Sequence, residues 1–208
     1  MSFERDFEHR DALRDAASKA FCEHGYGRAS LSAILTAAGM SKGQFYHHFD
    51  GKEALYLALV DDMVARKRAW FDEHPVPDHG GFLATLRAQL EAGLAFSRSH
   101  PELDQFSRSF LRERGRPIFR VVMRRAAFSD GGPLDELVRR YHEAGAFHGS
   151  LSVEVVRALI DTTFERVVDL LDLTSPEQLG QRMDAIVGFL GRGLGVRLEA
   201  PEDRADEP

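Results

Sequence analysis

Apolar residues recur at intervals of three and four along almost the whole chain, and the alternation typical of strands is almost absent. The first clear stripe consists of Leu13, Ala16, Ala17, Ala20 and Phe21. Side chains at this spacing share one face of a helix. The pattern therefore predicts an all-α protein, and the first helix is expected to end at Gly25, because glycine is the common helix stop.

Two short helices are predicted next. Ser30 can cap a helix whose apolar face is Leu31, Ile34, Leu35 and Ala38, and Gly39 is placed to end it. Ser41 and Gln44 have the spacing of a capping box, so another helix begins at Lys42 and continues to about Phe49. This is the spacing of a helix-turn-helix, whose second helix enters the DNA major groove. Helical hairpins also occur in bundles, so the spacing alone leaves a structural role open.

The remaining pattern predicts longer helices and a division of the chain. A fourth helix over about residues 51–74 ends before 75–81, the clearest proline- and glycine-containing linker. Further helices are expected at about 82–99, 101–114, 117–128, 134–147, 152–173 and 176–194. We therefore expect a helix-turn-helix DNA-binding domain in residues 1–50, a ligand-binding and dimerisation domain in 51–198 with the fourth helix as the bridge, and an acidic, disordered tail in 199–208.

Charge argues against binding to nucleic acid by bulk attraction, because the 208 residues carry a net charge of −6. The tail holds five acids and one base, which accounts for −4 of this charge. Between Lys19 and Lys52, four basic residues face two acids, a local excess of +2. The acidic start of the chain and the lack of a long apolar run predict a cytoplasmic protein with no membrane span, and the lone Cys22 cannot form an internal disulfide.

The third predicted helix has one apolar face and one polar face. Phe45 and Phe49 share the inner face, which directs Gly43 and His47 outward. Glycine lowers helix stability at an exposed site, so Gly43 indicates close approach of a partner.

The run from Gly25 to Leu55, GYGRASLSAILTAAGMSKGQFYHHFDGKEAL, resembles the DNA-binding signature of the tetracycline-repressor (TetR) family of bacterial transcription regulators. Leu35 and Met40 stand where the family usually has alanine and valine. The resemblance implies that Ser30 and Ser41 meet phosphate, that Tyr46 and Lys52 clamp the DNA backbone, and that Lys42, Gln44 and His47 face the bases. The predicted DNA-binding set is Arg28, Ser30, Ser41, Lys42, Gly43, Gln44, Tyr46, His47 and Lys52. An alternative stays open for two of these roles. In that alternative, Gln44 and Ser41 only cap each other, in place of a base contact, and Lys52 is a solvated charge that does not bind phosphate.

Enzymatic and metal chemistry are not expected. Gly39 to Gly43 spell G-x-S-x-G, but a nucleophile elbow needs a strand before the serine, and a helix is predicted there. The histidines lack ligand spacing, so we expect no catalytic residue, no metal and no cofactor.

Aromatic residues are frequent beyond the linker, which suits an apolar ligand site, although such residues more often fill a core. The resemblance places an effector site in the middle helices and nominates Phe106, Phe110, Met123, Tyr141 and His142 for a largely apolar small molecule. The last two helices have broad apolar faces, and Gly188, Gly191 and Gly195 would allow close approach of a second subunit. Closure of the monomer's own core is the alternative.

These patterns and the resemblance together predict a homodimer through about 152–173 and 176–194 that binds double-stranded DNA at a palindromic operator. It is expected to act as a repressor that a small molecule releases. The alternative is a helical ligand-binding or protein-interaction module without DNA binding.

Overall fold

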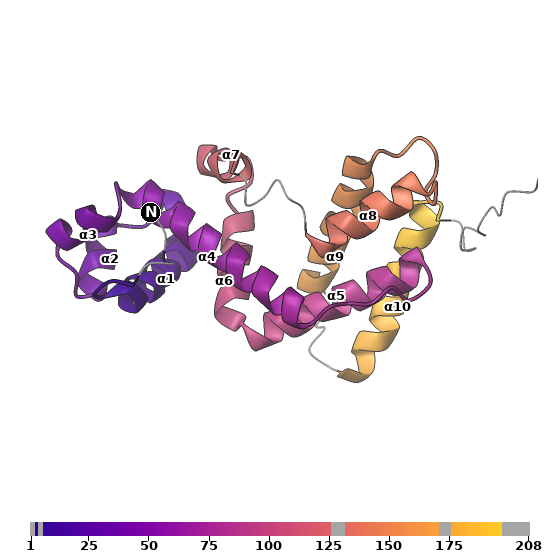
Figure 1. Cartoon of the computed structure of the whole chain (residues 1–208), viewed down its shortest axis with the longest axis horizontal. Coiled ribbons are helices and arrows are strands. Elements are labelled where there is room, and N and C mark those ends of the chain that lie inside the picture. The colour runs from indigo at the N-terminus through magenta and orange to yellow at the C-terminus, as the bar shows by residue number, and fades with distance from the viewer. Residues whose placement is uncertain (1–2, 4–5, 126–131, 171–175, 197–208) are drawn as a thin grey trace, which may run out of the picture. The chain divides into compact units, whose positions relative to one another are not determined.

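The computed structural model describes the chain except for residues 1–2, 4–5, 126–131, 171–175 and 197–208, and leaves the side chains of 165–170 and 176–179 undescribed. The described residues form α-helices and no strands, which confirms the all-α prediction (Figure 1). The helices are α1 (Arg10–Arg28), α2 (Leu31–Ala37), α3 (Lys42–His48), α4 (Lys52–Glu73), α5 (Phe82–Ser99), α6 (Pro101–Leu111), α7 (Pro117–Met123), α8 (Pro133–Glu143), α9 (Val153–Leu170) and α10 (Pro176–Gly193).

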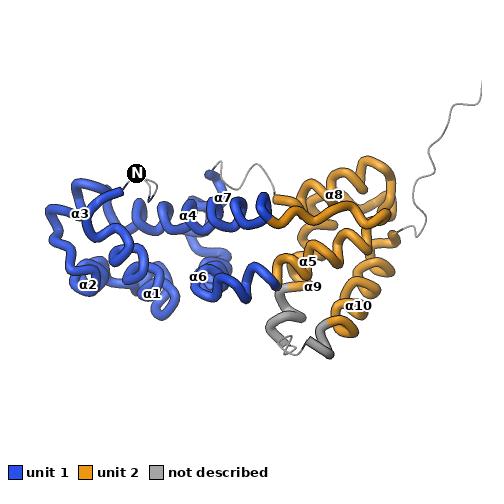
Figure 2. Tube along the Cα trace, turned by 60° about the horizontal axis from the view of Figure 1, so that its bottom comes forward, with its two compact units in different colours: residues 1–73, 95–130 blue, residues 74–94, 131–208 orange. Residues whose placement is uncertain are grey.

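Two compact units divide the chain, and each is discontinuous in sequence (Figure 2). Unit 1 contains residues 1–73 and 95–130, and unit 2 contains residues 74–94 and 131–208. The core of unit 1 is built around buried side chains of α1, α3 and α4, among them Phe21, Phe45 and Tyr56. Unit 2 has a separate core from α5, α8, α9 and α10, which includes Leu86, Ile160 and Met183.

These units do not follow the boundary expected at residues 50 and 51. Helices α6 and α7 belong to the same compact unit as the helix-turn-helix, because residues 95–130 pack with 1–73. The sequence prediction concerned which parts bind DNA and ligand, and that assignment stays a prediction.

Glycines account for three of the differences between the observed and the predicted helices, those of α1, α6 and α8. Helix α1 does not stop at Gly25 but kinks there, with φ 71° and ψ 166°, and continues to Arg28. Helices α6 and α8 end at Leu111 and Glu143, earlier than predicted, and the glycines just beyond them, Gly115 and Gly145, have φ of 83° and 70°. Glycine accepts this left-handed conformation at no steric cost, so the chain turns at these glycines. The apolar spacing continues past each turn, and for this reason it predicted longer helices.

None of the described helices is both long enough and apolar enough to cross a lipid bilayer.

Candidate nucleic-acid interface

Helix α2 and the turn after it have the end signals that the sequence predicted. Ser30 precedes the helix in extended conformation, and its Oγ accepts a hydrogen bond from the amide of Ala33 at 3.4 Å. Gly39 ends it with φ 65°, and the next amide, that of Met40, donates to the carbonyl of Leu35 at 2.9 Å. Met40 is buried, so the turn is fixed by a backbone bond and an apolar contact together.

Helix α3 begins with a complete capping box. The Ser41 Oγ accepts from the amide of Gln44 at 3.2 Å, and the Gln44 Oε1 accepts from the amide of Ser41 at 2.9 Å. The local role that the sequence left open for Gln44 is therefore present in the protein without DNA. Its Nε2 amide is the part of the side chain that this box does not use.

The outward face of α3 is polar and exposed, and its inner face is completely buried. Phe45 and Phe49 have no exposed surface. The exposed positions of this face are Ser41, Lys42, Gly43, Gln44, Tyr46 and His47. Tyr46 is 55% exposed, which is unusual for a large aromatic side chain and leaves its hydroxyl free to meet a partner.

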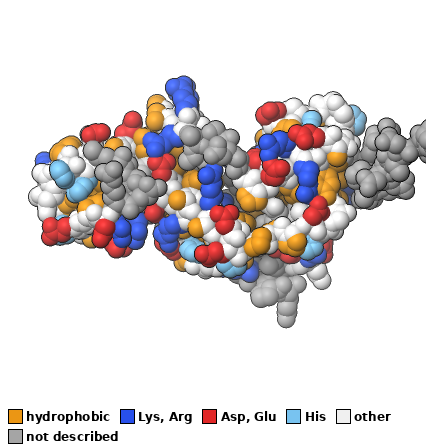
Figure 3. Space-filling model, viewed as in Figure 1, with side chains coloured by type: hydrophobic (Ala, Val, Ile, Leu, Met, Phe, Trp, Pro, Cys, Tyr) orange, Lys and Arg blue, Asp and Glu red, His pale blue; other side chains and the backbone are white. Residues whose placement is uncertain are grey.

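Arg28, the last residue of α1, and Ser30, the N-cap of α2, are also exposed. On the side of the molecule seen in Figure 3, basic and acidic side chains are interspersed among the described residues of both units. The net charge of −6 indicates that attraction to DNA comes from local groups.

Gly43 lies in open space. A Cβ built on it would have no heavy-atom neighbour within 4 Å. Packing inside the protein therefore does not require glycine here, in agreement with the inference that a partner approaches this part of the backbone.

Lys52, predicted to bind DNA phosphate, is directed into the protein in this structure. Its ammonium donates to the carbonyls of Tyr26 at 2.8 Å, Gly27 at 3.3 Å and Ala29 at 3.0 Å. It also lies 4.8 Å from the centre of the Tyr26 ring. Three acceptors use all three N–H donors of an ammonium, so Lys52 is not merely a solvated charge, and in this conformation it fixes the segment before α2.

The N-terminal segment covers the back of α3, a contact that the sequence analysis did not anticipate. Phe7 stacks on His48 with ring centres 4.2 Å apart, and Phe3 lies 5.5 Å from Phe49. The signal was present as two phenylalanines in a charged stretch, but nothing local predicts which surface they cover.

The five residues nominated for an effector site fall in different units. Phe106 and Phe110 are buried in unit 1, and Met123, also in unit 1, is 47% exposed. In unit 2, the Tyr141 hydroxyl donates to Asp78 Oδ1 at 3.4 Å, and the His142 Nε2 lies 2.8 Å from the carbonyl of Leu151. Their role in ligand binding stays a prediction.

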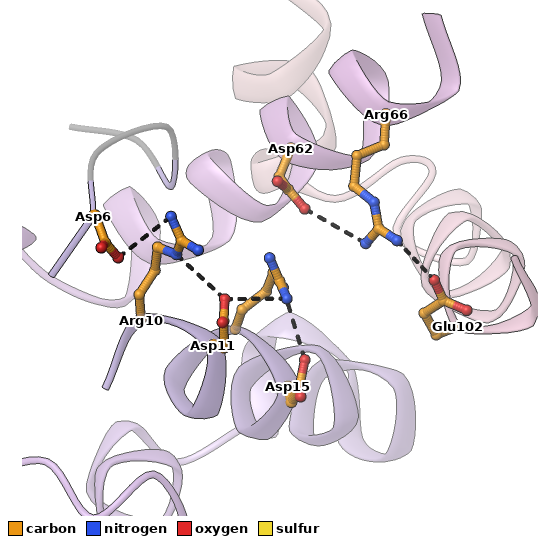
Figure 4. A network of polar contacts seen from close by, with 8 residues as sticks. Asp6, Arg10, Asp11, Asp15, Asp62, Arg66 and Glu102 are labelled. Carbon is orange, nitrogen blue, oxygen red and sulfur yellow. Dashed lines mark hydrogen bonds and ion pairs between the residues drawn. The ribbon is translucent and has the colours of Figure 1, made fainter. Parts of the chain in front are cut away.

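Phe106 borders a cleft of about 440 Å³ between α1, α4 and α6 of unit 1. The lining carries both signs of charge, including Arg14, Asp62 and Arg66. Figure 4 shows part of this polar network: Arg66 joins Asp62 of α4, at 3.9 Å, to Glu102 of α6, at 3.0 Å. The lining thus combines charged groups with apolar side chains such as Leu103 and Phe106.

Sequence reasoning missed the residues that join α6 to the end of α1. Ser109 Oγ donates to the carbonyl of Phe21 at 2.9 Å, and Arg112 Nη2 donates to the carbonyl of Cys22 at 3.2 Å. The carboxylate of Glu113 accepts from the amide of Tyr26 at 2.9 Å. These three residues lie in a polar, arginine-rich stretch that reads as a solvated surface, and their partners are almost 90 positions away.

The described helices and the exposed recognition face define a helix-turn-helix DNA-binding protein. Residues 13–59 match the family profile described as bacterial regulatory proteins, tetR family. This match and the relatives described next support a DNA-binding regulator of the TetR family, as the resemblance predicted.

Relatives match along most of the chain. The HTH-type transcriptional repressor AcnR of Corynebacterium glutamicum is 27% identical over 184 residues, which cover 86% of this chain and 90% of the relative. The HTH-type transcriptional repressor Rv1474c of Mycobacterium tuberculosis is 27% identical over 185 residues, with coverage of 88% and 93%.

Solved structures share the fold. A TetR family transcriptional regulator from Chloroflexus aurantiacus superposes with a TM-score of 0.66 at 22% identity, covering 92% of this chain and 95% of that one. The regulator FadR of Bacillus subtilis, solved in complex with stearoyl-CoA, gives 0.62 at 18% identity, with coverage of 86% and 96%.

Proposed function

We propose that the protein is a homodimeric transcriptional repressor that binds a palindromic operator through residues 28–52 and leaves it when a small molecule binds. The observation that carries the proposal is the exposed polar face of α3, which has no packing role and is presented on a completely buried aromatic pair, Phe45 and Phe49. The two relatives described above are named as repressors, and repression is taken from them.

Roles on the DNA follow from chemistry and position. Ser30 and Ser41 stand at helix N-termini, where backbone amides favour phosphate. We assign the hydroxyl of the exposed Tyr46 as a donor to the DNA backbone. Lys42, Gln44 and His47 supply donors for base edges, and Arg28 adds a flanking positive charge. A regulator of bacterial genes meets its operator in the cytoplasm, where we place this protein.

Exposed apolar side chains on α9 and α10 support a dimer. Val155 and Leu159 lie one turn apart on α9 and are each 44% exposed, and Phe189 on α10 is 60% exposed. Neighbouring exposed apolar side chains, such as Val155 and Leu159, form the kind of apolar patch that marks an interaction surface. A two-fold axis would also give two recognition helices for a palindrome.

The neighbouring faces of the same helices close unit 2 itself. Val156, Ile160 and Met183 have no exposed surface. Two of the three glycines expected at a dimer interface serve this internal packing, because a Cβ on Gly191 would meet Leu83 at 2.7 Å and a Cβ on Gly195 would meet His148 at 3.2 Å. These residues therefore close the core of unit 2 itself, and we propose the dimer contact for the exposed apolar side chains alone.

Release by an effector follows from the family and from the energetics of two states. The two helix-turn-helix regions of a dimer can be spaced to match the operator or not. A small molecule that binds the mismatched conformation more tightly weakens DNA binding by the difference between its two affinities.

The first test is selection of bound sequences from a random duplex library by the full-length protein at two salt concentrations. We expect an enriched palindrome whose affinity falls as salt rises, because phosphate contacts release counterions. No enrichment at low salt would favour the alternative, a helical ligand-binding or protein-interaction module without DNA binding. The enriched duplex then serves as the probe for an effector screen.

The dimer is tested by sedimentation of the wild type and of Phe189→Asp. The wild type should sediment as a dimer and the variant as a folded monomer, because an exposed carboxylate is tolerated on the free surface but not in an apolar interface. A dimeric variant would show that α10 is not the interface.

A further inference from the structure

The kink of α1 separates backbone groups that a regular helix would pair. Gly25 has φ 71° and ψ 166° inside the span of the helix. In an uninterrupted helix the amide of Tyr26 would donate to the carbonyl of Cys22. Here each needs another partner, since unpaired backbone groups are costly to bury.

Glu113 supplies the partner for the amide. Its Oε1 accepts from the Tyr26 N–H at 2.9 Å, and its Oε2 lies 3.1 Å from Nη1 of Arg116. The residue is only 3% exposed, so its carboxylate is held in the protein by these contacts rather than by water. The turn that carries it is itself fixed, because the amide of Arg116 donates to the Glu113 carbonyl at 2.9 Å.

Residues 25 and 113 are also matched in shape. A Cβ added to Gly25 would lie 2.8 Å from Glu113 Oε1. A side chain at position 25 and this carboxylate therefore exclude each other, independently of the strain that a positive φ imposes on any other residue. The glycine of the Gly-Tyr pair thus leaves room for a carboxylate from the turn that follows α6.

The same peptide segment is held from a second helix. The carbonyl of Tyr26 accepts from Lys52 Nζ at 2.8 Å, and Lys52 also bonds the carbonyl of Ala29, directly before the cap of α2. The connection from α1 to α2 is therefore fixed on its amide side by Glu113 and on its carbonyl side by the first residue of α4.

We propose that Glu113 is a positioning residue for DNA binding: without reaching DNA, it fixes the backbone between α1 and α2 and thereby the direction in which α2 and α3 leave α1. This inference rests on the chain binding DNA. It predicts that a shorter or non-accepting side chain at 113 allows the α2–α3 pair to tilt, so that the recognition helices of a dimer no longer match the half-site spacing of the operator.

The test uses four variants of the full-length protein, measured by operator affinity, thermal unfolding and repeated sequence selection. Glu113→Gln keeps an oxygen that can accept from Tyr26, whereas Glu113→Asp keeps the charge but is one methylene too short. Glu113→Ala removes both, and Arg116→Ala removes the ion pair while leaving the bond to Tyr26. Each is compared at a temperature at which it is folded.

We expect operator affinity to fall about tenfold or more for Glu113→Asp and Glu113→Ala, and to stay within about threefold of wild type for Glu113→Gln and Arg116→Ala. The aspartate variant should also select a changed or broadened half-site spacing, which a purely stabilising residue would not cause. If Glu113→Ala does not fold, the aspartate and glutamine variants decide.

Wild-type affinity and spacing in folded Glu113→Asp would overturn the proposal, as would a glutamine variant as weak as the aspartate one. If the wild type itself selects no sequence, the proposed function and the role of Glu113 both fail. If the wild type binds its operator and Glu113→Asp binds equally well, only the role of Glu113 fails.

Discussion

The Oε1 atom of Gln44 accepts a hydrogen bond from the backbone amide of Ser41 at 2.9 Å, at the start of the helix that is expected to read DNA. The side chain is thus held by its own helix before DNA arrives. Adenine is recognised by an amide that both donates and accepts. While the capping box is intact, Gln44 can donate from Nε2, and its Oε1 keeps a second lone pair that can accept from a base.

Replacing Gln44 separates these two roles. Gln44→Ala should relax the preference for one base pair per half-site, by about tenfold, because a specific base contact contributes roughly 1–3 kcal/mol of discrimination. Ser41→Ala is the matched control for the cap and should lower the free energy of unfolding by about 1 kcal/mol. Sequence selection and denaturant unfolding measure the two effects. If Gln44→Ala lowers stability but selects the wild-type motif, Gln44 is a cap alone.

Gly43→Ala should move stability and DNA affinity in opposite directions. The position is exposed, helical and open, so alanine should stabilise the protein by roughly 0.5–1 kcal/mol through helix propensity. The added methyl should weaken operator binding if DNA approaches the backbone there. Thermal unfolding and a binding titration of the same sample check both signs. Unchanged affinity would leave the glycine without a functional explanation.

Lys52→Met distinguishes an internal role from binding to phosphate. Methionine keeps much of the apolar stem but leaves three carbonyls without their donor, so the free energy of unfolding should fall by about 1–3 kcal/mol. The slope of log affinity against log salt should stay as in the wild type. If Lys52 instead neutralised one DNA phosphate, its replacement would reduce that slope by about 0.9. Tyr46→Phe, at an exposed position, is the companion variant and should weaken binding without lowering stability.

Asp62 predicts a pH dependence of stability. Burial, the largest cause, raises the pKa of its carboxyl, and the neighbouring charges of Arg14, Arg66 and Arg10 oppose this only in part, while Asp11 adds to it. Because the folded pKa lies above the unfolded value of about 3.9, the native carboxyl takes up its proton first as the pH falls. Its contribution to stability is therefore lowest at neutral pH and increases as the pH falls through the folded pKa.

The comparison of wild type with Asp62→Asn isolates this contribution. The wild type should gain stability relative to the variant between neutral pH and about pH 4, near the unfolded pKa of aspartate. Thermal unfolding of both proteins over this range measures the difference. A difference that does not change with pH would show that Asp62 has the same pKa in the folded and unfolded chain.

Helices α2 and α3 and the turn between them were predictable because the residues that cap and end them are close in sequence. The caps at Ser30 and Ser41 and the stop at Gly39 specify α2 and α3 within a few residues, and the structure confirms them. The burial of Phe45 and Phe49 followed from helical spacing alone.

The interactions that hold the head could not be predicted in this way. Glu113 and Lys52 are charged residues in polar surroundings, where sequence favours solvent, and both turn out to bond backbone groups of a distant segment. The kink at Gly25 has the same origin. A glycine there predicts a stop, but side chains from α6 and the turn after it satisfy the interrupted backbone, so the helix continues for one more turn.

The discontinuous first unit has a consequence for protein engineering. A fragment cut at the linker after α4 would retain every residue that we propose to face DNA. It would lack residues 95–130, and with them the side chains that bond the carbonyls of Phe21 and Cys22 and the amide of Tyr26. Chimeric regulators that exchange heads between sensor domains should therefore transplant α6 and its following turn together with α1 to α4. A graft limited to the N-terminal quarter would contain the exposed face of α3 but not the residues after α5 that we propose to orient it.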